Sequence, residues 1–277
     1  MKNNIFYILC FSLFFMSIGV YAQENKAETP KSATATAADL AKKLANPISS
    51  LISVPFQNNT DIGIGRFEGT RNTLNFQPVI PLKLSENLNL ITRVIIPVVS
   101  QYNITGVGQS EFGIANSTVS TWISPSTSKN GLIWGAGPAF LLPSSNKYLG
   151  SEKSGIGPTI ILLKQSKGLT YGMLVNQLWS VMGPTVDVAE VSSMFLQGFL
   201  VYNWKTGAGV GISSENTFNW ISNSNNSYLI PSITGLTKLG TQMVQLQIGP
   251  RIPLIFSDSE SRPDFGVRAS VVFVFPK

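Results

Sequence analysis

Two carboxylates, Glu111 and Glu215, are the side chains of this chain best suited to acid–base chemistry. Each lies on the polar side of a stretch in which polar and apolar residues alternate. Two carboxylates on one face could act as general acid and general base, but ion pairs with arginines on that face explain them better. The sequence contains no histidine, which excludes nucleophilic catalysis of the Ser–His kind. We therefore expect that the protein is not an enzyme.

Two further motifs are weaker. Residues 207–211 read Gly-Ala-Gly-Val-Gly, but no helix follows them as a phosphate-binding loop requires, and small residues that let a sheet bend explain them better. Asp258 and Glu260, with Asp264 close behind, could offer oxygen ligands to calcium or to ions that bridge lipopolysaccharide. The loop lacks the dense carboxylates and turn glycine of a calcium loop, which favours a solvated loop. The one cysteine, Cys10, lies in the first apolar run. We expect no metal and no cofactor.

The strongest pattern in the chain is an alternation of apolar and polar residues. Residues 244–252 read Val-Gln-Leu-Gln-Ile-Gly-Pro-Arg-Ile, and residues 265–275 have an apolar side chain at every second position. Successive side chains of a strand point to opposite faces, so each segment has one apolar and one polar face. Such segments recur twelve times, at about Ser50–Gly63, Arg71–Ile80, Leu88–Val98, Glu111–Ile123, Leu132–Leu142, Gly155–Lys164, Thr170–Ser180, Ser193–Asn203, Ala208–Trp220, Tyr228–Lys238, Gln242–Leu254 and Phe265–Phe275.

An even number of strands of this length is typical of outer-membrane barrels. The predicted fold class is all-β: a closed antiparallel transmembrane β-barrel of about 12 strands, with a short N-terminal helix. The connections between strands alternate between short ones with a lysine and longer ones rich in Gly, Ser and Asn. This alternation predicts short periplasmic turns, longer outer loops and both chain ends in the periplasm.

The chain divides into three parts. Residues 1–22 have a positive start, an apolar run and a small-residue site, which predicts an export signal cleaved after Ala22. Residues 23–49 are expected to be a polar tail with one helix over Thr36–Asn46, because Thr36 and Asp39 resemble a capping box and Pro47 ends the helix. Residues 50–277 would form the barrel in the bacterial outer membrane, with lipid and the barrel assembly machinery as partners.

Charged residues make up 12% of the chain, about half the usual share. The formal net charge is +6, and the basic residues form no cluster, so we expect no nucleic-acid partner. Nine aromatic residues near strand ends are expected to form interfacial girdles: Phe56, Trp122, Trp134, Tyr171, Trp179, Tyr202, Trp204, Trp220 and Tyr228. Six prolines fall in or near strands and are expected at bulges or rims, with slips of register beside them: Pro78, Pro97, Pro138, Pro158, Pro231 and Pro250.

The alternation also predicts which polar side chains line the lumen: Arg71, Asn75, Gln77, Arg93, Asn176, Gln197, Glu215, Gln245, Gln247, Arg251 and Arg268. Arginines outnumber the inward glutamates Glu111 and Glu215, so an aqueous path would favour anions. Alternatively, these side chains pair and fill the lumen. About eight strands close a barrel on its own side chains and about sixteen leave a channel, so twelve leave both possibilities open.

Several segments resemble one bacterial family. They are residues 45–59 (Ala-Asn-Pro-Ile-Ser-Ser-Leu-Ile-Ser-Val-Pro-Phe-Gln-Asn-Asn), 74–81 (Leu-Asn-Phe-Gln-Pro-Val-Ile-Pro), 131–143 (Gly-Leu-Ile-Trp-Gly-Ala-Gly-Pro-Ala-Phe-Leu-Leu-Pro) and the closing Phe-Pro-Lys. They are similar to the transporter-like outer-membrane β-barrels related to "phenol meta-pathway" proteins, some of which are mislabelled neuromedin U. The resemblance covers about residues 39–277. It implies passage of small, hydrophobic compounds and supplies no catalytic residues. The chain ends on Pro-Lys, whereas barrel assembly signals usually end on an aromatic residue.

The favoured function is therefore passive passage of small solutes, hydrophobic or anionic, across the outer membrane. The alternative is an occluded structural or interaction barrel whose loops bind a partner or a surface ligand. A secreted β-sandwich lectin is a third possibility, and it predicts solubility without detergent. The oligomeric state stays open at this point.

Overall fold

The computed structural model describes residues 36–186 and 188–275. Within them one helix, α2 (Ala37–Leu44), precedes fourteen strands and two short 3-10 helices. The strands are β1 (Ile52–Ile64), β2 (Gly69–Phe76), β3 (Val79–Lys83), β4 (Leu88–Tyr102), β5 (Ser110–Ile114), β6 (Ser117–Pro125), β7 (Leu132–Leu142), β8 (Ser154–Ser166), β9 (Leu169–Met182), β10 (Ser192–Asn203), β11 (Gly209–Asn219), β12 (Ser224–Leu239), β13 (Gln242–Phe256) and β14 (Phe265–Phe275). The 3-10 helices are η1 (Gly65–Phe67) and η2 (Ser259–Ser261).

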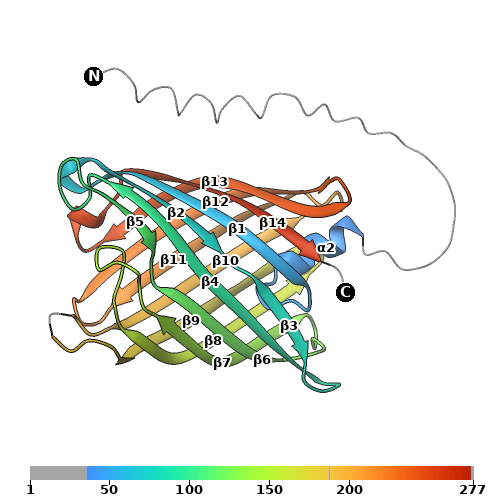
Figure 1. Ribbon diagram of the computed structural model, residues 1–277. Coiled ribbons are helices and arrows are strands. Elements are labelled where there is room, and N and C mark those ends of the chain that lie inside the picture. The colour runs from blue at the N-terminus through green and yellow to red at the C-terminus, as the bar shows by residue number, and fades with distance from the viewer. Residues whose placement is uncertain (1–35, 187, 276–277) are drawn as a thin grey trace, which may run out of the picture. The chain divides into compact units, whose positions relative to one another are not determined.

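These strands form a closed antiparallel barrel, shown in Figure 1. The sheet closes because β1 pairs with β14, from Ile52 opposite Phe275 to Ile62 opposite Phe265. Strands β2 and β3 are two halves of one interrupted wall strand that pairs with one edge of β4. Strands β5 and β6 are likewise two halves of one wall strand, which pairs with the other edge of β4. The described barrel wall therefore has twelve strands, and the predicted fold class is confirmed. The predicted leader and most of the polar tail lie outside the described residues.

The predicted helix is also confirmed. Thr36 caps α2 through a capping box, in which the backbone N–H of Asp39 donates to the Thr36 side chain and the Asp39 carboxylate accepts from Thr36. The Asp39 carboxylate next to the helix start is stabilised by these hydrogen bonds, chiefly the one from the Thr36 hydroxyl, and its pKa is lowered. No helix within 36–186 or 188–275 is both long and apolar enough to cross a membrane.

Large apolar side chains cover much of the outer face of the barrel. Examples on one side are Leu246, Ile248 and Ile252 of β13, each at least 36% exposed. Seven of the nine expected girdle aromatics are likewise exposed: Phe56, Trp134, Tyr171, Trp179, Tyr202, Trp204 and Trp220. The expectation is wrong for Trp122, which is fully buried in the lumen, and for Tyr228, which lies under Arg251. Each occupies an inward position of its strand, which proximity to a strand end does not reveal.

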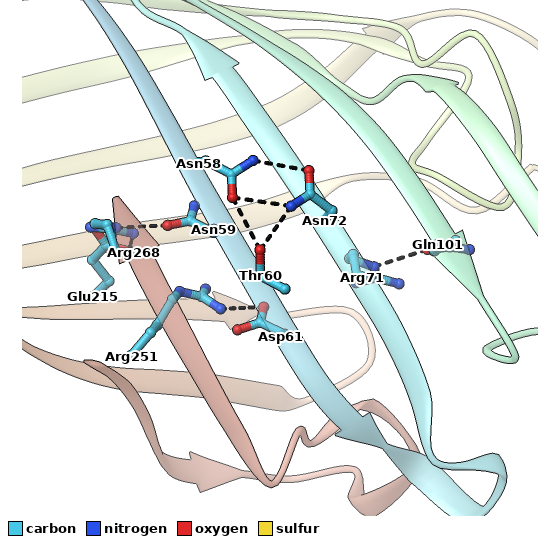
Figure 2. Close-up of polar contacts among 10 residues, drawn as sticks. All are labelled: Asn58, Asn59, Thr60, Asp61, Arg71, Asn72, Gln101, Glu215, Arg251 and Arg268. Atoms are coloured by element: carbon cyan, nitrogen blue, oxygen red, sulfur yellow. Dashed lines mark hydrogen bonds and ion pairs between the residues drawn. The ribbon is translucent and has the colours of Figure 1, made fainter. Parts of the chain in front are cut away.

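A polar cluster interrupts the apolar outer face on β1 and β2. Asn58, Thr60 and Asn72 alternate with inward neighbours and so point outward. The two amides exchange hydrogen bonds, Asn58 Nδ2 to Asn72 Oδ1 at 2.9 Å and Asn72 Nδ2 to Asn58 Oδ1 at 3.0 Å, and Asn72 Nδ2 also donates to Thr60 Oγ1 at 2.8 Å (Figure 2). Mutual pairing reduces the cost of holding these groups away from water.

The expected slip of register is present at Pro97, whereas pairing at the other five in-strand prolines is interrupted without a shift. The steps facing Pro138, Pro158, Pro231 and Pro250 are unpaired on one side, and the same register resumes beyond them. Pro78 separates β2 from β3. Pro97 faces the break between β5 and β6, where the pairing with β4 shifts by one residue, because Val98 pairs with Ile114 but Ile95 pairs with Thr118. A proline cannot donate to the ladder, so each of these steps loses a hydrogen bond. The alternation of inward and outward side chains is kept except across the break between β5 and β6, where it reverses.

Candidate functional site: a polar chamber in the lumen

The helix α2 lies at the end of the barrel where β1 begins and β14 ends. Its carbonyl groups accept hydrogen bonds from the wall, Lys42 O from Gln165 Nε2 at 2.7 Å and Ala41 O from Asn203 Nδ2 at 3.4 Å. Leu40 packs with Leu51 and with inward residues of β12, β13 and β14, and Ala41 is fully buried. The helix therefore covers the lumen at this end, which we call the short-turn end.

The segment after α2 enters the lumen and joins an apolar core. Ile48 packs with Val79, Ile91, Trp122, Ile161, Leu163 and Leu174, which come from β3, β4, β6, β8 and β9. The Trp122 ring is held by a 3.2 Å hydrogen bond from Nε1 to Thr159 Oγ1. One side of the lumen is thus filled by hydrocarbon, which the sequence analysis did not predict because it named only polar residues as lining the lumen.

The other side of the lumen contains two adjoining cavities, of about 170 Å³ and 210 Å³. Both are lined by Leu44, Pro47, Gln57, Gln197, Gln245 and Gln247, and we call them together the chamber. Arg268 also lines the first cavity, and Gln77 and Arg93 line the second. Six of the eleven predicted lumen residues therefore border one space, with α2 and the following segment as its floor.

An ion pair across the lumen borders the chamber on the side away from α2. Arg268 of β14 donates to Glu215 of β11 in a bidentate pair, at 2.6 and 2.8 Å, and its Nε donates to Asn59 Oδ1 at 2.7 Å (Figure 2). Their side chains are 5% and 15% exposed. Glu215 is thus committed to a structural pair. Glu111 instead binds Gln101 and Thr105, so the geometry brings no second carboxylate to Glu215.

Two further arginines are held by neighbouring wall residues. Arg251 pairs with Asp61 of β1 and lies 3.3 Å above the Tyr228 ring. Arg71 Nε donates to Gln101 Oε1 at 2.9 Å. Sequence reasoning missed Asp61, although the alternation of β1 placed it on the polar face. Its carboxylate lowers the net positive charge that the sequence analysis expected in the lumen.

Arg93 of β4 has neither an ion pair nor a side-chain hydrogen bond among the described residues, whereas Arg71, which also lacks an ion pair, donates to Gln101. The Arg93 guanidinium lies 5.4 Å from the centre of the Trp122 ring. Its Nε is buried, again without a hydrogen-bond partner within the described residues. The charges of Arg268 and Glu215 cancel, so Arg93 leaves one positive charge beside the chamber.

The two predicted asparagines lie apart from the charged groups. Asn75 is opposite Gln57 and Pro97 on the neighbouring strands. Asn176 is 8% exposed and lies opposite Thr159 and Phe195, beside the apolar core. At the far end of the barrel, Asp258 caps η2 and Glu260 lies 3.7 Å from Arg66. The described part of the chain holds no group of three or more acidic, cysteine or histidine side chains arranged for a metal ion.

Comparison with solved structures supports the barrel assignment. An outer-membrane channel from Pseudomonas putida F1 is similar, with a TM-score of 0.63, 15% sequence identity, and coverage of 83% of this chain and 97% of that chain. The beta domain of the Bordetella autotransporter Brka matches with a TM-score of 0.47 and 8% identity, covering 82% of this chain and 100% of its own. No protein-family model and no curated protein matches the sequence. The first likeness confirms the outer-membrane barrel fold.

Proposed function

We propose that this protein resides in the bacterial outer membrane and gives small solutes passive passage through its lumen, with α2 as the closure at the short-turn end. The observation that supports this most is the chamber, a polar space inside a barrel whose outer face is largely apolar. A barrel that served only as a scaffold would gain from filling that space with hydrocarbon, as its other side does. In this proposal the short turns face the periplasm and no reaction is catalysed.

The closure is held by few polar contacts. Two hydrogen bonds from Gln165 and Asn203 and a small apolar cluster around Leu40 attach α2 to the wall. A typical hydrogen bond contributes only about 0.5–1.5 kcal/mol net. Displacement of α2 is therefore energetically accessible, and it would open the chamber toward the short-turn end.

A disulfide can test whether α2 must move. A Cβ placed on Gly207 would lie 3.2 Å from the Cβ of Ala37, close to the roughly 3.5–4.5 Å spanned by disulfides. The variant A37C/G207C would be folded in detergent and inserted into planar bilayers. We expect discrete conductance after reduction and a strong decrease after oxidation, whereas the single-cysteine variants conduct in both conditions. Folding is checked by heat-modifiable gel mobility, because Gly207 has a positive φ that disfavours a side chain.

A second variant tests the closure without strain. Q165L/N203L removes both hydrogen bonds to the carbonyls of α2 and should increase the open fraction. Folded wild type, reduced A37C/G207C and Q165L/N203L that all leave membranes silent would overturn the proposal. That result would favour the alternative function, an occluded barrel whose loops bind a partner, which the ion pairs inside the lumen support.

A further inference from the structure

The unpaired charge of Arg93 faces a space large enough for a small molecule. Arg93 lines the second cavity, whose volume of about 210 Å³ corresponds to about seven waters at roughly 30 Å³ each. A guanidinium has five donors in a planar fork that matches a carboxylate. Arg268 and Arg251 already donate to the carboxylates of Glu215 and Asp61, although Arg251 Nε has no partner in the described part of the chain. Arg93 has no carboxylate partner in that same part.

The surroundings of Arg93 are divided between donors and hydrocarbon. Gln77, Gln245 and Ser270 line the same cavity and can donate hydrogen bonds to an anion. Leu44, Pro47, Val79 and Val272 line it with hydrocarbon. A pocket with one charged group, a few polar groups and apolar walls orients an amphipathic ligand.

We propose that the chamber binds a small monocarboxylate with a short apolar body, its carboxylate on Arg93 and its body against the apolar lining. One uncompensated positive charge matches one negative charge, whereas a divalent anion would bring a second charge with no counter-charge. The inference rests on the proposed function and names the class of solute that the lumen would select.

Binding can be followed without measuring transport. Arg93 lies over the Trp122 ring, so occupancy of Arg93 should change the tryptophan fluorescence of the detergent-folded protein. The probe is butyrate, compared with butyramide, which has the same shape without charge, and with chloride at equal ionic strength. We expect a saturable change with butyrate and none with butyramide or chloride.

Two variants make the test specific. R93Q removes the charge and should weaken butyrate binding by at least about tenfold, the range expected for hydrogen bonds to a charged group. R66Q removes an arginine whose side chain is 71% exposed and which lies at the far end of the barrel, outside the chamber lining, and should bind butyrate as the wild type does. Calorimetric titration of both variants gives the affinity independently of fluorescence. R93Q should fold, because it removes a buried charge that has no ion-pair partner.

The outcomes separate this inference from the proposed function. Equal binding of butyrate by R93Q and wild type, or equal binding of butyramide, would overturn the carboxylate site. Conductance without saturable butyrate binding would overturn this inference and leave passage intact. Butyrate binding through Arg93 in a barrel that never conducts would support the site and refute passage.

Discussion

Replacing Glu215 by glutamine tests whether the ion pair across the lumen holds the barrel together. The substitution keeps the size of the side chain and removes the charge that balances Arg268. Because Arg268 and Glu215 are only 5% and 15% exposed, water can replace the lost partner poorly. Breaking a buried pair by removing one member costs about 3–5 kcal/mol.

The structure places E215Q near the lower end of that range. Arg268 borders the chamber, where water can reach it, and it keeps the 2.7 Å hydrogen bond from Nε to Asn59. We therefore expect E215Q to lower the free energy of unfolding by about 3 kcal/mol. Adding R268Q should recover at least half of that loss, because the double variant leaves no uncompensated charge.

The assay is urea unfolding of the protein folded in lipid vesicles, followed by tryptophan fluorescence and extrapolated linearly to zero denaturant. The matched control is E260Q, which breaks the exposed pair with Arg66 at 3.7 Å and should cost about 0–1 kcal/mol. A loss for E215Q no larger than that for E260Q would refute the reasoning. So would a double variant less stable than E215Q alone.

Three further predictions concern the wall and the closure. G157A should destabilise the barrel by about 1–3 kcal/mol, because an added Cβ would lie 1.8 Å from a carbonyl oxygen of β9, whereas G198A meets nothing within 4 Å and should change urea stability little. N72L should destabilise the barrel by about 1–3 kcal/mol, because the Asn58 amide on the outer face loses its hydrogen-bond partner. An unchanged urea midpoint would contradict this. The pKa of Asp39 is lowered by the Thr36 hydroxyl, so its support of α2 is present above the ordinary carboxyl pKa and lost as pH falls through the lowered value. Bilayer conductance should accordingly rise in acid, and D39N should conduct at neutral pH as the wild type does in acid; a wild-type conductance independent of pH would refute this.

The sequence by itself determined the wall of this protein. The alternation of apolar and polar residues is a local property, because successive side chains of a strand point to opposite faces of the sheet. Strands β7 and β14 have the predicted ends, Leu132–Leu142 and Phe265–Phe275, and the capping box identified α2 before any contact was known.

Only the tertiary structure decided what fills the lumen. Alternation states that a side chain points inward but not which inward side chains meet across the barrel. Arg268 reaches Glu215 on a strand three places away, and Arg251 reaches Asp61 two places away, because closure and stagger bring these strands to the same height. Trp122 went unrecognised because the pairing with β4 shifts by one residue between β5 and β6, which reverses the face on which the side chains of β6 lie. The entry of Ile48 beside it depends on long-range packing. Arg93 is the lumen arginine left with neither an ion pair nor a side-chain hydrogen bond among the described residues.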